Sequence, residues 1–150
     1  MKLSHIVSGM LLLSLVSQAQ TPADGWSIFS AVKFKTEYFK EHNLYLQVPV
    51  LDEKAKSKIG TWITLSGHYM PFEMPDNRII LSLYPYASCF FCGGGAGPES
   101  VAEIVFTQKP SEFYADQWIT VRGKLKINAL DIDRMNFILE NAVIIPEKKP

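Results

Sequence analysis

The chain has 150 residues, of which 47% are hydrophobic and 20% are charged, and its 15 basic side chains balance its 15 acidic ones. A chain of this length is enough for one domain with a hydrophobic core. A surface that follows nucleic-acid phosphates needs clustered positive charge. The lysines here are scattered along the sequence, so we expect no nucleic-acid partner.

Residues 1–19 have the layout of a cleaved secretory signal peptide. Lys2 lies near the start, residues 6–16 form a mostly apolar run, and Ser17 and Ala19 are small residues before the expected cleavage point. The apolar run is shorter than the ~20 residues of a membrane-spanning helix. We therefore expect a mature chain of residues 20–150 without a transmembrane segment, located in the periplasm or secreted.

The first part of the mature chain predicts an apolar cluster, two strands and a short helix. Trp26, Ile28 and Phe29 form the cluster, which we expect to dock onto the body of the protein. Apolar and polar residues alternate over 32–38, and an extended run over 44–50 is interrupted by a proline. Residues 51–59 predict one or two helical turns that end at Gly60.

The remaining chain predicts five more strands, at residues 61–70, 79–86, 101–107, 118–127 and 135–145. Glycines inside two of them, Gly67 and Gly123, indicate bends or bulges. We expect Trp62, Trp118 and Phe137 in the core. The spacing of the strands predicts an all-β fold with one or two short helices, a small OB-like curled barrel of five or more strands in a single domain over residues 20–150.

Residues 89–100 concentrate the reactive chemistry, because they contain both cysteines and four of the nine glycines of the chain. Cys89 and Cys92 are three positions apart, so their thiols can close a disulfide, bind a soft metal or exchange with another thiol. The glycines allow the backbone to turn sharply and to approach a ligand. The predicted binding loop comprises Phe90, Phe91, Gly93, Gly94, Gly95, Gly97 and Glu99.

The segment Ala-Ser-Cys-Phe-Phe-Cys-Gly-Gly-Gly-Ala-Gly-Pro-Glu at residues 87–99 resembles one found in a family of small exported Bacteroidetes proteins of unknown function, with one additional glycine. The stretch 60–71 is similar to the first barrel strand of the same family. More distantly, the chain resembles an exported OB-like domain family whose matching strand ends in Gly-Ala-Cys-Ile-His followed by prolines. In that alignment Cys92 stands near the family's histidine, and metal affinity is what a thiol and an imidazole share.

A metal site is the first interpretation of the two cysteines. Cys-x-x-Cys-Gly is the shape of a zinc knuckle, and zinc takes four ligands. His68 lies near the end of its predicted strand, where we expect it to serve as a third ligand beside Cys89 and Cys92. Copper(I) is an alternative to zinc because it accepts two thiolates and needs fewer ligands.

Two other interpretations remain open. Export favours a Cys89–Cys92 disulfide, which would make the protein a disulfide-stabilised scaffold for a partner protein. Thiol–disulfide exchange is the other, although no βαβ pattern of the thioredoxin type surrounds the motif. The leading hypothesis is an uncharacterised exported envelope protein, a non-enzymatic binding module whose partner is a metal ion or another envelope protein.

Overall fold

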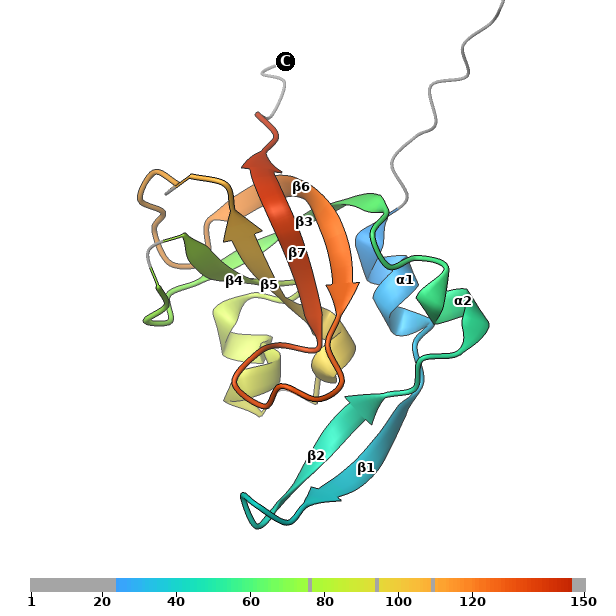
Figure 1. Cartoon of the computed structure of the whole chain (residues 1–150). Coiled ribbons are helices and arrows are strands. Elements are labelled where there is room, and N and C mark those ends of the chain that lie inside the picture. Colours follow the sequence, from blue (N-terminus) through green and yellow to red (C-terminus); the bar gives the residue numbers. More distant parts are fainter. Residues whose placement is uncertain (1–23, 76, 94, 109, 147–150) are drawn as a thin grey trace, which may run out of the picture.

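The computed structural model describes residues 24–75, 77–93, 95–108 and 110–146. The predicted signal peptide and its cleavage point therefore lie outside the described residues. Seven strands and two short α-helices make up the regular structure of the described part (Figure 1). Strands and helices are α1 (Gly25–Ser30), β1 (Phe34–Phe39), β2 (Leu44–Pro49), α2 (Glu53–Lys56), β3 (Trp62–Met70), β4 (Arg78–Ser82), β5 (Val101–Phe106), β6 (Trp118–Ile127) and β7 (Phe137–Ile144).

Five of the strands close into a barrel in the order β3-β4-β5-β7-β6, with β6 pairing back onto β3. All neighbours are antiparallel except β5 and β7, which run parallel. The predicted all-β, OB-like barrel is confirmed. Closure leaves none of these five strands as a free edge, which removes the unpaired backbone groups that an open sheet would expose.

The two glycines inside strands mark close approaches of the barrel backbone. A Cβ at Gly67 would lie 2.4 Å from the backbone oxygen of Ser82 on β4. A Cβ at Gly123 would lie 2.9 Å from the Cβ of Leu139 on β7, and the pairing of β6 with β7 shifts register between Arg122 and Lys124. The predicted bulge at Gly123 is therefore confirmed.

Strands β1 and β2 form a separate two-stranded sheet that projects from the barrel (Figure 1). Both were predicted as strands, and their pairing runs from Phe34 opposite Pro49 to Phe39 opposite Leu44. At the base of this hairpin, the ring of Phe34 meets that of Phe137 edge-on at 6.1 Å between centroids. The hairpin is thus attached at one end.

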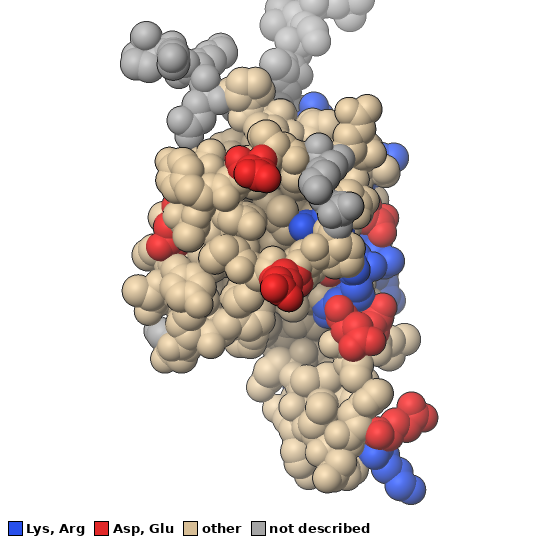
Figure 2. All heavy atoms as spheres, turned by 90° about the vertical axis from the view of Figure 1, so that its left-hand side faces the viewer, with Lys and Arg blue, Asp and Glu red and all other residues tan. Residues whose placement is uncertain are grey.

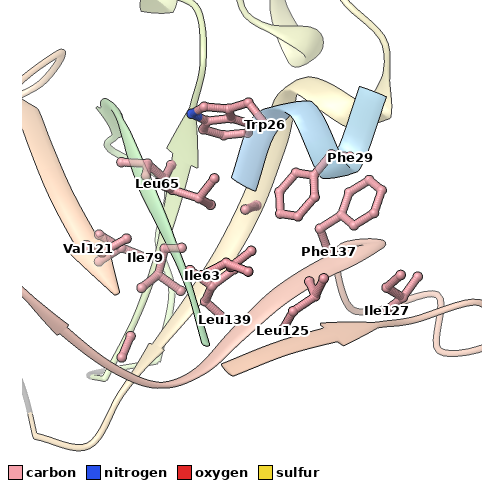
Figure 3. Packing of buried hydrophobic residues seen from close by; sticks show 14 of the residues in the cluster. Trp26, Phe29, Ile63, Leu65, Ile79, Val121, Leu125, Ile127, Phe137 and Leu139 are labelled. Atoms are coloured by element: carbon pink, nitrogen blue, oxygen red, sulfur yellow. The ribbon is translucent and has the colours of Figure 1, made fainter. Parts of the chain in front are cut away.

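Helix α1 packs its aromatic side chains into the barrel, as expected for the cluster near the start of the mature chain. Asp24 caps the helix by accepting a hydrogen bond from the backbone N–H of Trp26 at 3.2 Å. The indole N–H of Trp26 donates to the backbone oxygen of Ser66 on β3 at 2.9 Å. Phe29 is fully buried and stacks on Phe137 with ring centroids 4.0 Å apart (Figure 3).

The core prediction was correct for Phe137 and wrong for two tryptophans. Phe137 is fully buried, whereas Trp62 and Trp118 are 45% and 47% exposed. Along β3 the residues that point inward are Ile63, Leu65 and Gly67, so Trp62 belongs to the outward set. Because side chains alternate between the two faces of a strand, the position within the alternation decided the outcome and hydrophobicity did not.

The described helices include none that is long and apolar enough to cross a membrane. Helix α2 covers four residues from Glu53. It is capped by Asp52, whose side chain accepts a hydrogen bond from the N–H of Ala55 at 2.8 Å. The helix ends at Lys56, four residues before the predicted end at Gly60; residues 57–60 form a turn, in which Gly60 has a left-handed backbone with φ of +79°. Glycine adopts this conformation without the steric penalty that a Cβ brings.

Candidate functional site

Residues 83–100, which we call the cysteine segment, connect β4 to β5. The strand predicted for residues 79–86 ends at Ser82, four residues earlier than expected. Three short 3₁₀ turns follow, at Tyr86–Ser88, Phe90–Cys92 and Pro98–Ser100. The backbone N–H of Leu83 donates to the oxygen of Ser100 at 2.9 Å, which closes the segment into a loop on the barrel.

The two cysteines lie in contact at the centre of this segment. Their Sγ atoms are 2.9 Å apart, and the backbone N–H of Cys92 donates to the oxygen of Cys89 at 3.1 Å. Both are free thiols; Cys89 is fully buried and Cys92 is exposed. One sulfur is therefore fixed by the protein interior, while the other is open to solvent and to a reaction partner.

Cys89 belongs to a small apolar cluster that is separate from the main barrel core. The buried members of this cluster are Met70 at the end of β3, Ile80 on β4 and Cys89 itself. Three half-buried side chains pack against them, namely Phe72, Met74 and Met135. Three thioethers thus lie at the cluster that contains the buried thiol. The sequence spacing did not predict this arrangement, because Met135 is more than 40 residues from Cys89 in the chain.

The pKa of the Cys92 thiol is raised above its ordinary value. The hydrogen bond with the Cys89 thiol contributes most, followed by loss of solvent and by the negative charges of Cys89 and Asp116. All of these disfavour the thiolate. A reactive exchange cysteine has the opposite property, a lowered pKa.

His68, the predicted third ligand, makes other contacts. Its Nδ1 lies 3.2 Å from the backbone oxygen of Asp116, and its ring packs edge-on against Trp118 at 5.0 Å. Across the described ranges, no three His, Cys, Asp or Glu side chains lie together as a metal site would require. The structure therefore brings Cys89 and Cys92 together but does not add His68 to them.

Asp116 connects the cysteine segment to β3 and was not singled out from the sequence. Its carboxylate accepts a hydrogen bond from the backbone N–H of Tyr86 at 2.6 Å, and its own N–H donates to the oxygen of Tyr69 at 3.1 Å. The residue has a φ of +61°, a conformation that Asp and Asn tolerate better than most side chains. Asp116 thus holds the start of the segment in place.

The predicted binding loop is described except for Gly94, which lies outside the described residues. Gly93 and Gly95 have left-handed backbones with φ of +76° and +79°. Phe90 and Phe91 are about 40% exposed, and Phe91 meets Phe72 edge-on at 5.0 Å. The side chain of Glu99 folds back over Gly97, where a Cβ would lie 2.2 Å from it.

An apolar groove of about 270 Å³ separates the cysteine segment from the β1–β2 hairpin. The side of the molecule seen in Figure 2 carries few charged side chains outside a cluster near its right-hand edge. The residues that line the groove include Tyr45, Leu46, Phe90, Phe91, Arg134 and Met135.

A buried cluster of ionic side chains adjoins this groove through Arg134, and the sequence did not predict it. The side chain of Glu103 on β5 is 1% exposed and pairs with Arg78 at 3.1 Å and with Arg134 at 2.8 Å. The hydrogen bond to Glu103 is the main cause of the raised pKa of Arg134. Glu103 is fully paired, so we assign it a structural role. It ties the loop between β6 and β7 to the barrel.

Comparisons with known proteins add little to this geometry. No protein-family model and no curated protein matches the chain. Among solved structures, it is similar to a DUF3299 family protein from Pseudomonas aeruginosa, with 12% sequence identity and a TM-score of 0.47. That match covers 67% of this chain and 70% of the other.

Proposed function

We propose that this protein is an exported, non-enzymatic binding module of the cell envelope in which Cys89 and Cys92 bind a soft metal ion. The observation that carries the proposal is the 2.9 Å approach of the two sulfurs, one buried and one exposed. The signal-like residues 1–19 and the resemblance to exported Bacteroidetes proteins support the envelope location.

The surroundings of the pair favour copper(I) over zinc. Zinc takes four ligands, and the part of the chain that the structure describes groups no third His, Cys, Asp or Glu with the two thiols. Copper(I) is selected by thiolate and thioether sulfur. Cys89 shares its cluster with Met70, and Met74 and Met135 pack against it.

Two thiolates on one tetrahedral zinc would be about 3.8 Å apart, given Zn–S bonds of about 2.3 Å. The pair must therefore open slightly to admit any metal. Cys92 can make this adjustment because its side chain is exposed, whereas the position of Cys89 is set by packing. A cation between the sulfurs would also replace the proton that the raised pKa of Cys92 retains.

Copper loading of the full chain tests this proposal. The mature protein is purified from the periplasm under reducing, oxygen-free conditions, loaded with copper(I), stripped of weakly bound metal with a copper(I) chelator, and measured by elemental analysis. We expect one copper per chain in the wild type and in Ser88→Ala, an exposed control next to the pair. We expect none in the Cys89→Ser/Cys92→Ser double variant.

The same loading series tests whether His68 is a copper ligand and whether copper binding depends on the protonation of the thiols. His68→Ala is expected to retain copper, because His68 contacts Asp116 and Trp118. Copper affinity is expected to rise with pH, since metal binding must release the proton that the raised pKa holds on Cys92. A wild type that retains no copper, or a double variant that retains as much as the wild type, would contradict the proposal.

The sulfur contact also supports a second candidate, a thiol–disulfide pair. A disulfide bond is about 2.05 Å long, so a small rotation would join the sulfurs. Closure transfers two electrons to an oxidised disulfide of an envelope oxidase, and the two thiol protons leave with them. Protein from the periplasm that has no free thiols when denatured, and no metal, would favour this candidate; a disulfide-stabilised scaffold predicts in addition that the double variant still binds its partner protein.

A further inference from the structure

The outer face of strands β3 and β6 is a continuous strip of aromatic, hydroxyl and cationic side chains. It lies on the outside of the barrel, because the inward positions of β3 are occupied by Ile63, Leu65 and Gly67. The register places the outward residues of the two strands directly opposite each other. These pairs are Trp62 with Lys124, Thr64 with Arg122, Ser66 with Thr120 and His68 with Trp118.

Two half-exposed tryptophans mark the ends of this strip. Trp62 is 45% exposed and Trp118 is 47% exposed, although tryptophan is on average a highly buried residue. Trp118 lies opposite His68, six residues along β3 from Trp62. At about 3.3 Å per residue, the two indoles are roughly 20 Å apart along the strand.

Hydroxyl groups and a shallow groove lie between the tryptophans. The hydroxyls of Ser66 and Thr120 are hydrogen-bonded at 2.8 Å, so each retains capacity for a further hydrogen bond. The groove has a volume of about 500 Å³, and Thr64, Ser66 and Trp118 line it together with Asp24. Trp26 and Leu83 also line the groove, so Trp118 presents its ring beside both hydrogen-bonding groups and apolar side chains.

The Trp62 end of the strip is cationic. The guanidinium carbon of Arg122 lies 5.4 Å from the centroid of the Trp62 ring, and the ammonium nitrogen of Lys124 lies 5.7 Å from it. The neighbouring carboxylate of Glu140 pairs with Lys126 at 3.5 Å. Two positive groups are thus held against an exposed aromatic surface, where an anionic ligand could stack and pair at once.

We propose that this strip binds an acidic oligosaccharide, with sugar rings stacked on Trp62 and Trp118 and a carboxylate bound by Arg122 and Lys124. A pyranose ring offers an apolar C–H face to an indole and hydroxyls to Thr64, Ser66 and Asp24. A nucleic acid fits less well, because the groups between the tryptophans are the hydroxyls of Thr64, Ser66 and Thr120 and the carboxylate of Asp24 beside Thr64. These groups pair with sugar hydroxyls and offer no positive charge to a phosphate backbone. This inference does not depend on the cysteine pair.

Tryptophan fluorescence and titration calorimetry test the proposal on the mature full chain. The probes are oligogalacturonate as the acidic sugar, cello-oligosaccharide as the neutral sugar, and oligo(dT) as the nucleic acid. We expect binding of oligogalacturonate that weakens about tenfold or more in Trp62→Ala and in Trp118→Ala, the loss typical of a central aromatic contact. Tyr114→Ala is the control, since Tyr114 is 73% exposed and lies outside the strip.

A second variant separates charge recognition from stacking. The double variant Arg122→Gln/Lys124→Gln is expected to bind oligogalacturonate about tenfold more weakly than the wild type. Its affinity for cello-oligosaccharide is expected to stay nearly unchanged. Thermal denaturation of each variant checks that the barrel remains folded. Binding of oligo(dT) alone, binding of none of the three probes, or tryptophan variants that bind oligogalacturonate as the wild type does would overturn the proposal.

Discussion

Every residue of β6 is paired with β3 or β7, whereas the cysteine segment is held mainly by hydrogen bonds between residues three apart. The barrel buries most of the large apolar side chains of the described chain, while among the described residues of the cysteine segment only Cys89 and Ser100 are buried. Its link to β3 through Asp116 and its closure onto Ser100 are the main long-range attachments.

The barrel therefore supplies most of the stability of the protein, whereas the cysteine segment carries its reactive groups. The barrel derives its stability from dispersed packing and a complete hydrogen-bond network, so a single core change is costly there. The segment derives its shape from a few contacts, so its exposed thiol, Cys92, can adjust to a ligand without disturbing the barrel. We expect substitutions in the two regions to differ accordingly, and the following changes test that expectation.

The largest effect is expected from Phe137→Ala. Phe137 is fully buried and stacks on Phe29 at the junction of α1 and the barrel. Removing the ring leaves a cavity that costs about 3–5 kcal/mol in the free energy of unfolding. Urea denaturation followed by circular dichroism measures this loss. A change in the free energy of unfolding below about 1 kcal/mol would show that the barrel is no more sensitive to substitution than the cysteine segment.

The next effect is expected from Glu103→Ala. The substitution leaves Arg78 and Arg134 without their buried carboxylate. We expect a loss of about 3 kcal/mol, at the lower end for a broken buried ion pair, because both arginines are about one-quarter exposed. Urea denaturation at neutral pH measures it, with Glu112→Ala as an exposed control. Equal stability of the two variants would remove the structural role assigned to Glu103.

A smaller loss is expected from Gly67→Ala. The new Cβ would meet the backbone oxygen of Ser82 at 2.4 Å, so β3 and β4 must move apart. Overpacking of this kind costs about 1–3 kcal/mol. The matched control is Ala87→Gly in the exposed part of the cysteine segment, and thermal denaturation compares the two. A barrel that accepts Gly67→Ala without loss would mean that this strand pair is looser than its geometry implies.

The smallest effects distinguish the two thiols. Cys89→Ser places a hydroxyl in an apolar cluster and is expected to cost about 1–2 kcal/mol. Cys92→Ser changes an exposed side chain and is expected to alter the free energy of unfolding by no more than about 0.5 kcal/mol. Denaturation of both variants under reducing conditions compares them; the reverse order would contradict the division between a buried and an exposed sulfur.

The same division explains which predictions from the sequence were correct. The strands at residues 61–70 and 118–127 were predicted closely, because alternation of apolar and polar residues follows directly from the pleat of a strand. The strand at residues 101–107 was also predicted closely, although it is buried almost continuously and does not alternate. The strand predicted for residues 79–86 was too long, because Leu83, Tyr84 and Tyr86 are apolar or aromatic without being part of a ladder. Trp62 and Trp118 were misplaced because their size was weighted above their position in the alternation.

The candidate site was only partly accessible from the sequence. The proximity of Cys89 and Cys92 follows from their spacing of three residues, and the structure places their sulfurs in contact. The contacts of His68 with Asp116, of Met135 with the cysteine cluster and of Glu103 with two arginines join residues that are 30 or more positions apart or lie on different strands. No local sequence pattern encodes contacts between residues so far apart in the chain.

By itself, the sequence determined the class of fold, the strands of the barrel and the location of the thiol pair, because backbone geometry ties each of these to short-range spacing. Only the tertiary structure decided which side chains surround the pair and which face of β3 and β6 carries the tryptophans. Those outcomes depend on strand register and on how loops close over the barrel, and a shift of one residue in register would reverse them.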